Sequence, residues 1–107
     1  DDPAFLHDTP SSLPTLVLAH NPDSAVGLAD GDAALVLAGH THGGQICLPG
    51  GKTIVTNCGI DRPRAQGLHD FGPMKMHVSN GLGTYKFAPV RLFCRPSATL
   101  LRITEVD

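Results

Sequence analysis

The stretch LVLAGHTHGGQICLP, residues 35–49, joins an apolar run to a turn that contains two histidines. The run over residues 33–40 is short and continuously apolar, which is typical of a strand covered on both faces. His40 and His42 are two residues apart, so an extended backbone would place both side chains on one face, about 6–7 Å apart at Cα. Neutral imidazole is the commonest metal ligand in proteins. The stretch therefore predicts a buried strand that ends in a ligand-bearing turn.

Glycines surround the two histidines. Gly39 precedes the pair, and Gly43 and Gly44 follow it. Glycine permits positive φ and allows close approach to the main chain, so we expect these glycines to form a turn and to leave room for a substrate.

A second apolar run also ends in a histidine. PTLVLAH, residues 14–20, reads as another buried strand, and His20 follows it directly. Ligands of layered α/β folds bind beyond the carboxyl ends of strands, so two neighbouring strands would bring His20 and His40 to one rim. A single histidine at a strand end is more often a surface or hydrogen-bonded residue. Spacing alone therefore leaves the structural and the ligand interpretations open.

The remaining pattern predicts a layered α/β or α+β domain with mostly strands and one short helix. Asn21 and Pro22 suit the start of a helix, which we expect to end near Gly31. The prolines, glycines and mixed charges of residues 59–73 predict a loop. Further strands are expected over residues 52–57, 74–80 and 97–106.

Composition limits the classes of function. The chain has 107 residues, 41% apolar and 17% charged, which suits one globular domain. Its net charge of −2 and the absence of a basic cluster give no sign of a nucleic-acid-binding surface. The apolar runs are far shorter than the roughly 20 residues that span a bilayer, so no transmembrane segment is predicted. Cys47, Cys58 and Cys94 lack CxxC spacing, so we expect ordinary half-buried thiols.

Three longer strings resemble a known family. LAHNPD (18–23), LVLAGHTHGGQ (35–45) and VSNGLGTYKFAPVRLFCRPSATLLRI (78–103) are similar to the C-terminal motifs of calcineurin-like metallophosphoesterases. The likeness is to a bacterial branch that includes exported phosphodiesterases and hydrolases of UDP-diacylglucosamine. Ser97 is a departure, because many relatives carry an acidic residue there.

The resemblance implies that residues 1–107 are the C-terminal half of a four-layer αββα sandwich with a binuclear metal centre. It implies that His20 and His40 bind one metal and His42 its partner, with Mn, Fe, Zn or Ni as candidates. The family's D-x-H, GDxxD and GNH[DE] motifs do not occur in the 107 residues. We therefore expect no catalytic residue here and inactivity of the chain alone. The resemblance also implies an exported or membrane-peripheral location for the parent protein.

The expected function is metal-dependent hydrolysis of a phosphomonoester or phosphodiester by the parent protein. Gly43, Gln45 and Arg91 are candidates for substrate binding. The guanidinium of Arg91 matches the geometry of phosphate oxygens. An ordinary surface role for Arg91 is equally open. The alternative function is a non-catalytic metal-binding or interaction module that pairs with another chain. In either case we expect the chain to self-associate or to bind the missing N-terminal half.

Overall fold

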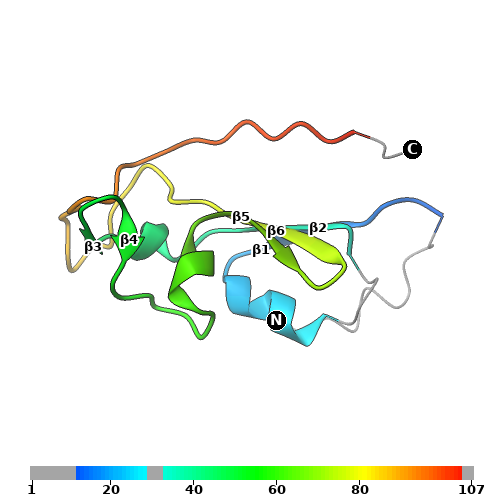
Figure 1. The fold of residues 1–107 in the computed structure, drawn as a ribbon, viewed down its shortest axis with the longest axis horizontal. Coiled ribbons are helices and arrows are strands. Elements are labelled where there is room, and N and C mark those ends of the chain that lie inside the picture. The colour runs from blue at the N-terminus through cyan, green and yellow to red at the C-terminus, as the bar shows by residue number, and fades with distance from the viewer. Residues whose placement is uncertain (1–11, 29–32, 105–107) are drawn as a thin grey trace.

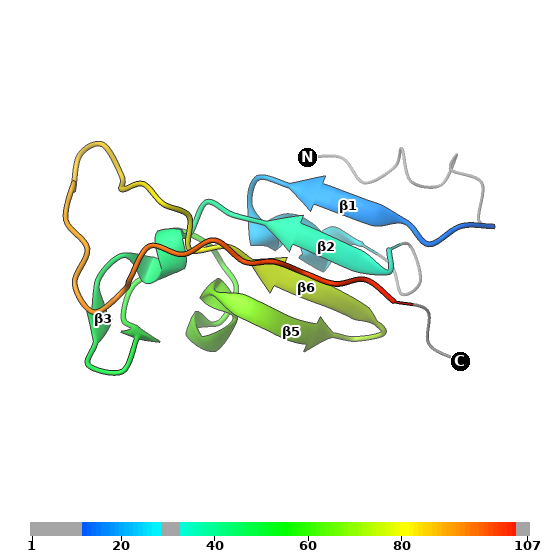
Figure 2. The ribbon, with the colours of Figure 1, turned by 90° about the horizontal axis from the view of Figure 1, so that it is seen from above.

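The computed structural model describes residues 12–28 and 33–104. Its central element is a four-stranded sheet in the order β1–β2–β6–β5 (Figures 1 and 2). The strands are β1 (Leu16–Ala19), β2 (Leu35–Ala38), β5 (Gly67–Phe71) and β6 (Met74–Val78). β1, β2 and β6 run parallel, whereas β5 pairs antiparallel with β6. The strands predicted over residues 14–20, 33–40 and 74–80 are confirmed with shorter bounds.

The sheet packs its core on one face. Val36 of β2 lies in register with Val17 of β1 and Met76 of β6, and both Val36 and Met76 are fully buried. Met74 and Val78 of β6 belong to the same cluster, which also contains Ala25 and Ile60. Side chains of a strand alternate between faces, so the neighbouring positions of the same strands point to the opposite side.

Three short 3₁₀ helices lie between the strands of the described residues. They are η2 (Pro22–Gly27), η3 (His42–Gly44) and η4 (Arg62–Ala65). η2 begins where the sequence predicts, and the Asn21 side chain accepts a hydrogen bond from the Asp23 N–H at 3.0 Å. It ends at Gly27, and the predicted end near Gly31 falls outside the described residues. None of these helices combines the length and apolar character needed to cross a membrane.

A small hairpin projects beyond the main sheet. β3 (Cys47–Leu48) and β4 (Lys52–Thr53) pair antiparallel at the end where β1, β2 and β6 finish (Figure 2). The strand predicted over residues 52–57 is therefore too long, because only its first two residues have a pairing partner.

Two sequence predictions are wrong. Residues 59–73 are not a loop throughout, since they contain η4 and β5. β5 forms a hairpin with β6 through Gly72, whose φ is 62°, and Pro73. Residues 97–104 form no strand, because they cross above the sheet face instead of joining an edge where a backbone partner is available (Figures 1 and 2).

The sheet face opposite η2 is apolar and open over β1. Leu16 and Leu18 of β1 point to this face, and Leu18 is 81% exposed. Among residues 12–28 and 33–104, the C-terminal segment is the one that passes over it (Figure 1). Leu100 of that segment is 98% exposed. A monomer seldom leaves a large contiguous apolar surface uncovered, so this face is suited to another layer.

Candidate metal centre

His20 and His40 meet at the carboxyl ends of two adjacent parallel strands. β1 and β2 end in register at Ala19 and Ala38, and the Gly39 N–H donates to the carbonyl of His20 at 3.3 Å. The ring centroids of His20 and His40 are 4.7 Å apart, with the planes tilted by 55°. His20 is exposed and His40 is half-buried. The predicted meeting of these two imidazoles at one rim is confirmed.

The His40 ring is oriented by the main chain. Its Nε2 lies 3.3 Å from the carbonyl oxygen of Asn57. A carbonyl only accepts hydrogen bonds, so Nε2 carries the proton and Nδ1 of the neutral ring keeps its lone pair. Metal-binding histidines commonly donate their second ring N–H to a carbonyl in this way.

Asp23 positions the loop that supplies this carbonyl. Its carboxylate accepts hydrogen bonds from the Gly59 N–H at 2.7 and 2.8 Å and from the Ile60 N–H at 3.0 Å. In the sequence, Asp23 stands three residues after His20, and nothing there indicates this long-range contact. The contact links the segment after His20 to the loop whose Asn57 carbonyl lies against His40.

The backbone of the histidine turn, residues 39–45, adopts unusual conformations. His40, His42 and Gln45 have φ values of 67°, 51° and 56°. Positive φ is uncommon for residues other than glycine, and such conformations cluster at functional sites. Thr41 supports the turn, because its hydroxyl donates to the Ala65 carbonyl at 2.6 Å. The fold therefore holds the turn in a conformation that the local sequence does not favour.

Gly43 and Gly44 lie where any side chain would collide with other residues of the same chain. A Cβ on Gly43 would lie 2.7 Å from both Asn80 Oδ1 and Cys94 Sγ. A Cβ on Gly44 would lie 2.2 Å from a methyl carbon of Thr53. Gly39, by contrast, has no atom within 4 Å of such a Cβ, so open space adjoins the turn there.

Arg91 and Gln45 bind main-chain groups in the described structure. The Arg91 guanidinium donates to the carbonyls of His42 at 3.1 Å and Asn80 at 2.7 Å, and also to those of Gly81, Gly83 and Cys94. The Gln45 amide is buried, where it accepts from the Tyr85 N–H at 2.7 Å and donates to the Ala88 carbonyl. These contacts tie the loop of residues 80–95 to the histidine turn. Substrate binding by Gly43, Gln45 and Arg91 stays a prediction.

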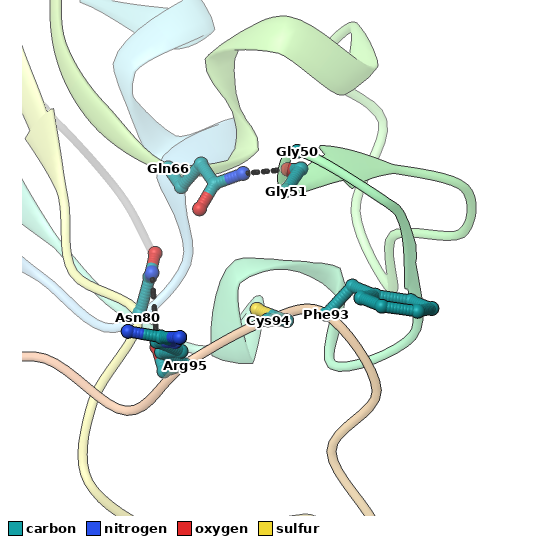
Figure 3. A pocket seen from close by; sticks show the side chains of 7 residues that line it. All are labelled: Gly50, Gly51, Gln66, Asn80, Phe93, Cys94 and Arg95. Carbon is teal, nitrogen blue, oxygen red and sulfur yellow. Dashed lines mark hydrogen bonds between the residues drawn. The ribbon is translucent and has the colours of Figure 1, made fainter.

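A hollow of about 400 Å³ lies behind the turn (Figure 3). Its lining consists of Gly50, Gly51, Gln66, Asn80, Phe93, Cys94 and Arg95. Asn80 and Cys94 are the residues that also border Gly43, so the hollow and the histidine turn share a wall.

The donor set for a metal is partial. Within residues 12–28 and 33–104, no three His, Cys, Asp or Glu side chains gather closely enough to hold an ion. His42 thus does not complete a three-ligand cluster with His20 and His40. The two adjacent imidazoles suit a transition metal by their chemistry. They fit part of a metal site, and the remaining donors would have to come from elsewhere.

Comparison with known proteins gives a consistent set of relatives. The chain is 39% identical over 94 residues to the phosphodiesterase YaeI of Escherichia coli strain K12, an alignment that covers 87% of this chain and 33% of that protein. It is 38% identical over 106 residues to the UDP-2,3-diacylglucosamine pyrophosphatase LpxG of Chlamydia muridarum, covering 92% and 31%. It is 34% identical over 93 residues to the uncharacterized metallophosphoesterase YkuE of Bacillus subtilis strain 168, covering 87% and 32%.

No family model matches the chain, and no solved structure matches it. The chain spans about a third of the length of the curated relatives it matches. Over most of its own length, this chain is therefore homologous to one portion of metallophosphoesterases, among them YaeI and LpxG.

Proposed function

We propose that the chain supplies part of the metal centre of a metal-dependent phosphoesterase. The observation that carries this proposal is the contact between the His20 and His40 rings at the ends of two parallel strands. Homology to metallophosphoesterases gives the pair its functional context. The substrate class is a phosphomonoester or phosphodiester, since one relative is named a phosphodiesterase and another a pyrophosphatase.

In this proposal His20 and His40 hold one divalent ion and His42 holds a second, with Mn, Fe, Zn or Ni as the candidates. Such ions supply Lewis-acid polarisation of a phosphoryl oxygen and an activated water. The chain's own contribution is orientation. The Asn57 carbonyl directs the proton of His40 to Nε2, and Arg91 fixes the main chain of His42.

The proposal includes the missing half of the domain. The open apolar face over Leu16 and Leu18 is the surface that a second sheet would cover in a four-layer sandwich. The same longer protein would provide the additional metal donors, including carboxylates. We therefore expect the 107-residue chain to bind metal weakly and to lack hydrolytic activity by itself.

A metal titration tests the assignment directly. Calorimetry with Mn²⁺ and Zn²⁺ on the chain should show binding that His20→Ala and His40→Ala each weaken at least tenfold. His69→Ala is the matched control, because its ring nitrogen lies 2.5 Å from the Gln66 carbonyl oxygen and, within the described residues, its ring has no stacking contact with His20 or His40. Equal affinity in all four proteins would contradict the proposal. Activity should be measured on bis-p-nitrophenyl phosphate with the chain and with the longer parent protein.

A second candidate function is a non-catalytic module that pairs with another chain. The exposed leucines of β1 and of residues 97–104 favour it. The two functions differ in one outcome, because an interaction module would bind its partner equally well after loss of His20 and His40.

A further inference from the structure

Two thiols distant in sequence converge beneath the histidine turn. The Cys47 and Cys94 side chains both donate to the carbonyl of Gly43, at 3.4 and 3.3 Å. Cys47 is 2% exposed and Cys94 is 3% exposed. Cys58 lies apart from them, packed against the hydrophobic core of the sheet. The sequence, with no CxxC spacing, gave no reason to pair any two of these cysteines.

The backbone brings the two cysteine segments together. Ile46 and Leu92 form a parallel bridge, and the Cys47 N–H donates to the Leu92 carbonyl at 2.8 Å. Paired segments lie roughly 5 Å apart, and Cys47 and Cys94 follow the bridge by one and two residues. Both sulfurs lie within 3.4 Å of the same atom, the carbonyl oxygen of Gly43. The two sulfurs are therefore neighbours around one oxygen, on segments that the backbone already holds side by side.

The two thiols differ in their surroundings. Cys94 lines the 400 Å³ hollow, so a small molecule in the hollow can reach its sulfur (Figure 3). Arg91 Nη1 lies 3.7 Å from that sulfur. Cys47 does not line the hollow, and burial raises the pKa of its thiol.

We propose that Cys47 and Cys94 are a redox pair that forms an intramolecular disulfide, with Cys94 reacting first. The oxidant is a low-molecular-weight disulfide that enters the hollow. Cys94 gives its proton to solvent, and its sulfur attacks one sulfur of the oxidant, which forms a mixed disulfide and releases one thiolate. Cys47 then gives its proton to solvent and attacks the Cys94 sulfur, which releases the second thiolate. Two protein thiols are oxidised while one external disulfide is reduced to two thiols.

Oxidation changes what supports the histidine turn. The hydrogen bonds that the two thiols donate to the carbonyls of His42 and Gly43 are lost, because a disulfide has no S–H. A covalent link between β3 and the segment at Cys94 takes their place. Arg91 and Thr53 still donate to these two carbonyls, so the turn keeps part of its support. The oxidised chain should resist unfolding at a higher urea concentration than the reduced chain.

Peptide mapping after incubation with oxidised glutathione tests the pair. The folded chain should lose two hydrogen atoms and give one cross-linked peptide that joins Cys47 to Cys94. The same chain in urea should give pairings that include Cys58. Cys58→Ser should leave the native pairing unchanged, and far-UV circular dichroism should confirm that each variant folds.

The order of reaction has its own test. Cys47→Ser should accumulate a stable glutathione adduct on Cys94, whereas Cys94→Ser should acquire little adduct on Cys47. Three outcomes would each overturn the proposal. They are a disulfide to Cys58 in the folded chain, a disulfide between two chains, and thiols that stay reduced under conditions that oxidise the unfolded chain. Equal adduct formation at Cys47 and Cys94 would overturn the assignment of Cys94 as the attacking thiol.

Discussion

The imidazole rings of His20 and His40 lie 4.7 Å apart, centroid to centroid, although the two residues follow different strands. Parallel pairing of β1 and β2 in register produces this contact, since it ends both strands at the same level. One residue of slippage would turn His20 to the opposite face of the sheet. The metal-binding hypothesis for this chain therefore depends on strand register as much as on the histidines.

Replacement of His40 should separate ligand loss from backbone strain. His40 has a φ of 67°, a conformation that asparagine tolerates better than alanine. We expect His40→Asn to lower the affinity for Mn²⁺ or Zn²⁺ while it changes the free energy of unfolding by less than about 0.5 kcal/mol. His40→Ala should lower both, with about 1 kcal/mol lost through strain. Calorimetry and urea unfolding measure the two effects, and unchanged affinity in His40→Asn would argue against a ligand role.

Two glycine substitutions test how tightly the histidine turn is packed. Gly44 has a φ of 86°, and an added Cβ would lie 2.2 Å from a Thr53 methyl carbon and 2.9 Å from the Val55 carbonyl oxygen. We expect Gly44→Ala to destabilise the fold by about 3 kcal/mol or more. Gly50→Ala is the control, because its φ of 89° is similar but no atom lies within 4 Å. It should cost only about 1 kcal/mol. Similar urea midpoints for the two variants would show that backbone strain alone sets the cost.

Arg91 should matter for stability because its guanidinium binds several main-chain carbonyls at once. Lysine cannot reproduce this planar fork, so Arg91→Lys should lower the free energy of unfolding by about 2–3 kcal/mol. Arg95→Lys is the matched control, since Arg95 forms no side-chain hydrogen bond or ion pair with the described residues. It should change stability by less than about 0.5 kcal/mol. If Arg91→Lys unfolds like the wild type and raises only the KM of the parent enzyme, Arg91 is a phosphate ligand instead.

His77 should make the fold less stable in mild acid. Burial, together with the charge of nearby His69, lowers the pKa of His77 below its ordinary value of 6.5. Below pH 6.5 the His77 side chain therefore binds a proton more readily in the unfolded chain than in the folded chain. The free energy of unfolding falls as the pH drops toward the lowered pKa. Above pH 6.5 both states are neutral and the effect vanishes.

The variant His77→Gln isolates this contribution from those of the other histidines. Urea midpoints measured between about pH 7.5 and pH 5 should fall less steeply in the variant than in the wild type. The same slope in both proteins would show that His77 titrates alike in the folded and unfolded chains.

Self-association should depend on the open sheet face. Leu18 is 81% exposed on that face, and a charge there should weaken any contact made through it. We expect the wild type to scatter light as an oligomer at micromolar concentration and to bind the dye ANS, and Leu18→Glu to reduce both. Val26→Glu is the control, because Val26 is 65% exposed on η2, at the other side of the sheet. A wild-type chain that is monomeric and leaves ANS dark would show that the face needs no further layer.

The local sequence was sufficient to predict two strands of the sheet and the start of η2. The apolar runs before His20 and His40 predicted two buried strands, and Asn21 and Pro22 predicted where η2 begins. The placement of both histidines at one rim followed from the same runs, because parallel strands finish at a common edge. These features depend on neighbouring residues and on hydrophobic burial, which a single sequence displays.

Tertiary structure alone decided the rest. β5 forms because β6 offers it a backbone partner, while residues 97–104 form no strand because they cross a face of the sheet instead of joining an edge. The sequence left Arg91 open between phosphate binding and an ordinary surface role, and folding places carbonyls from two loops around its guanidinium. Cys47 and Cys94 became neighbours only through the bridge between Ile46 and Leu92. Each of these outcomes depends on contacts between distant segments, and the residues on either side of a contact carry no local sign of the other.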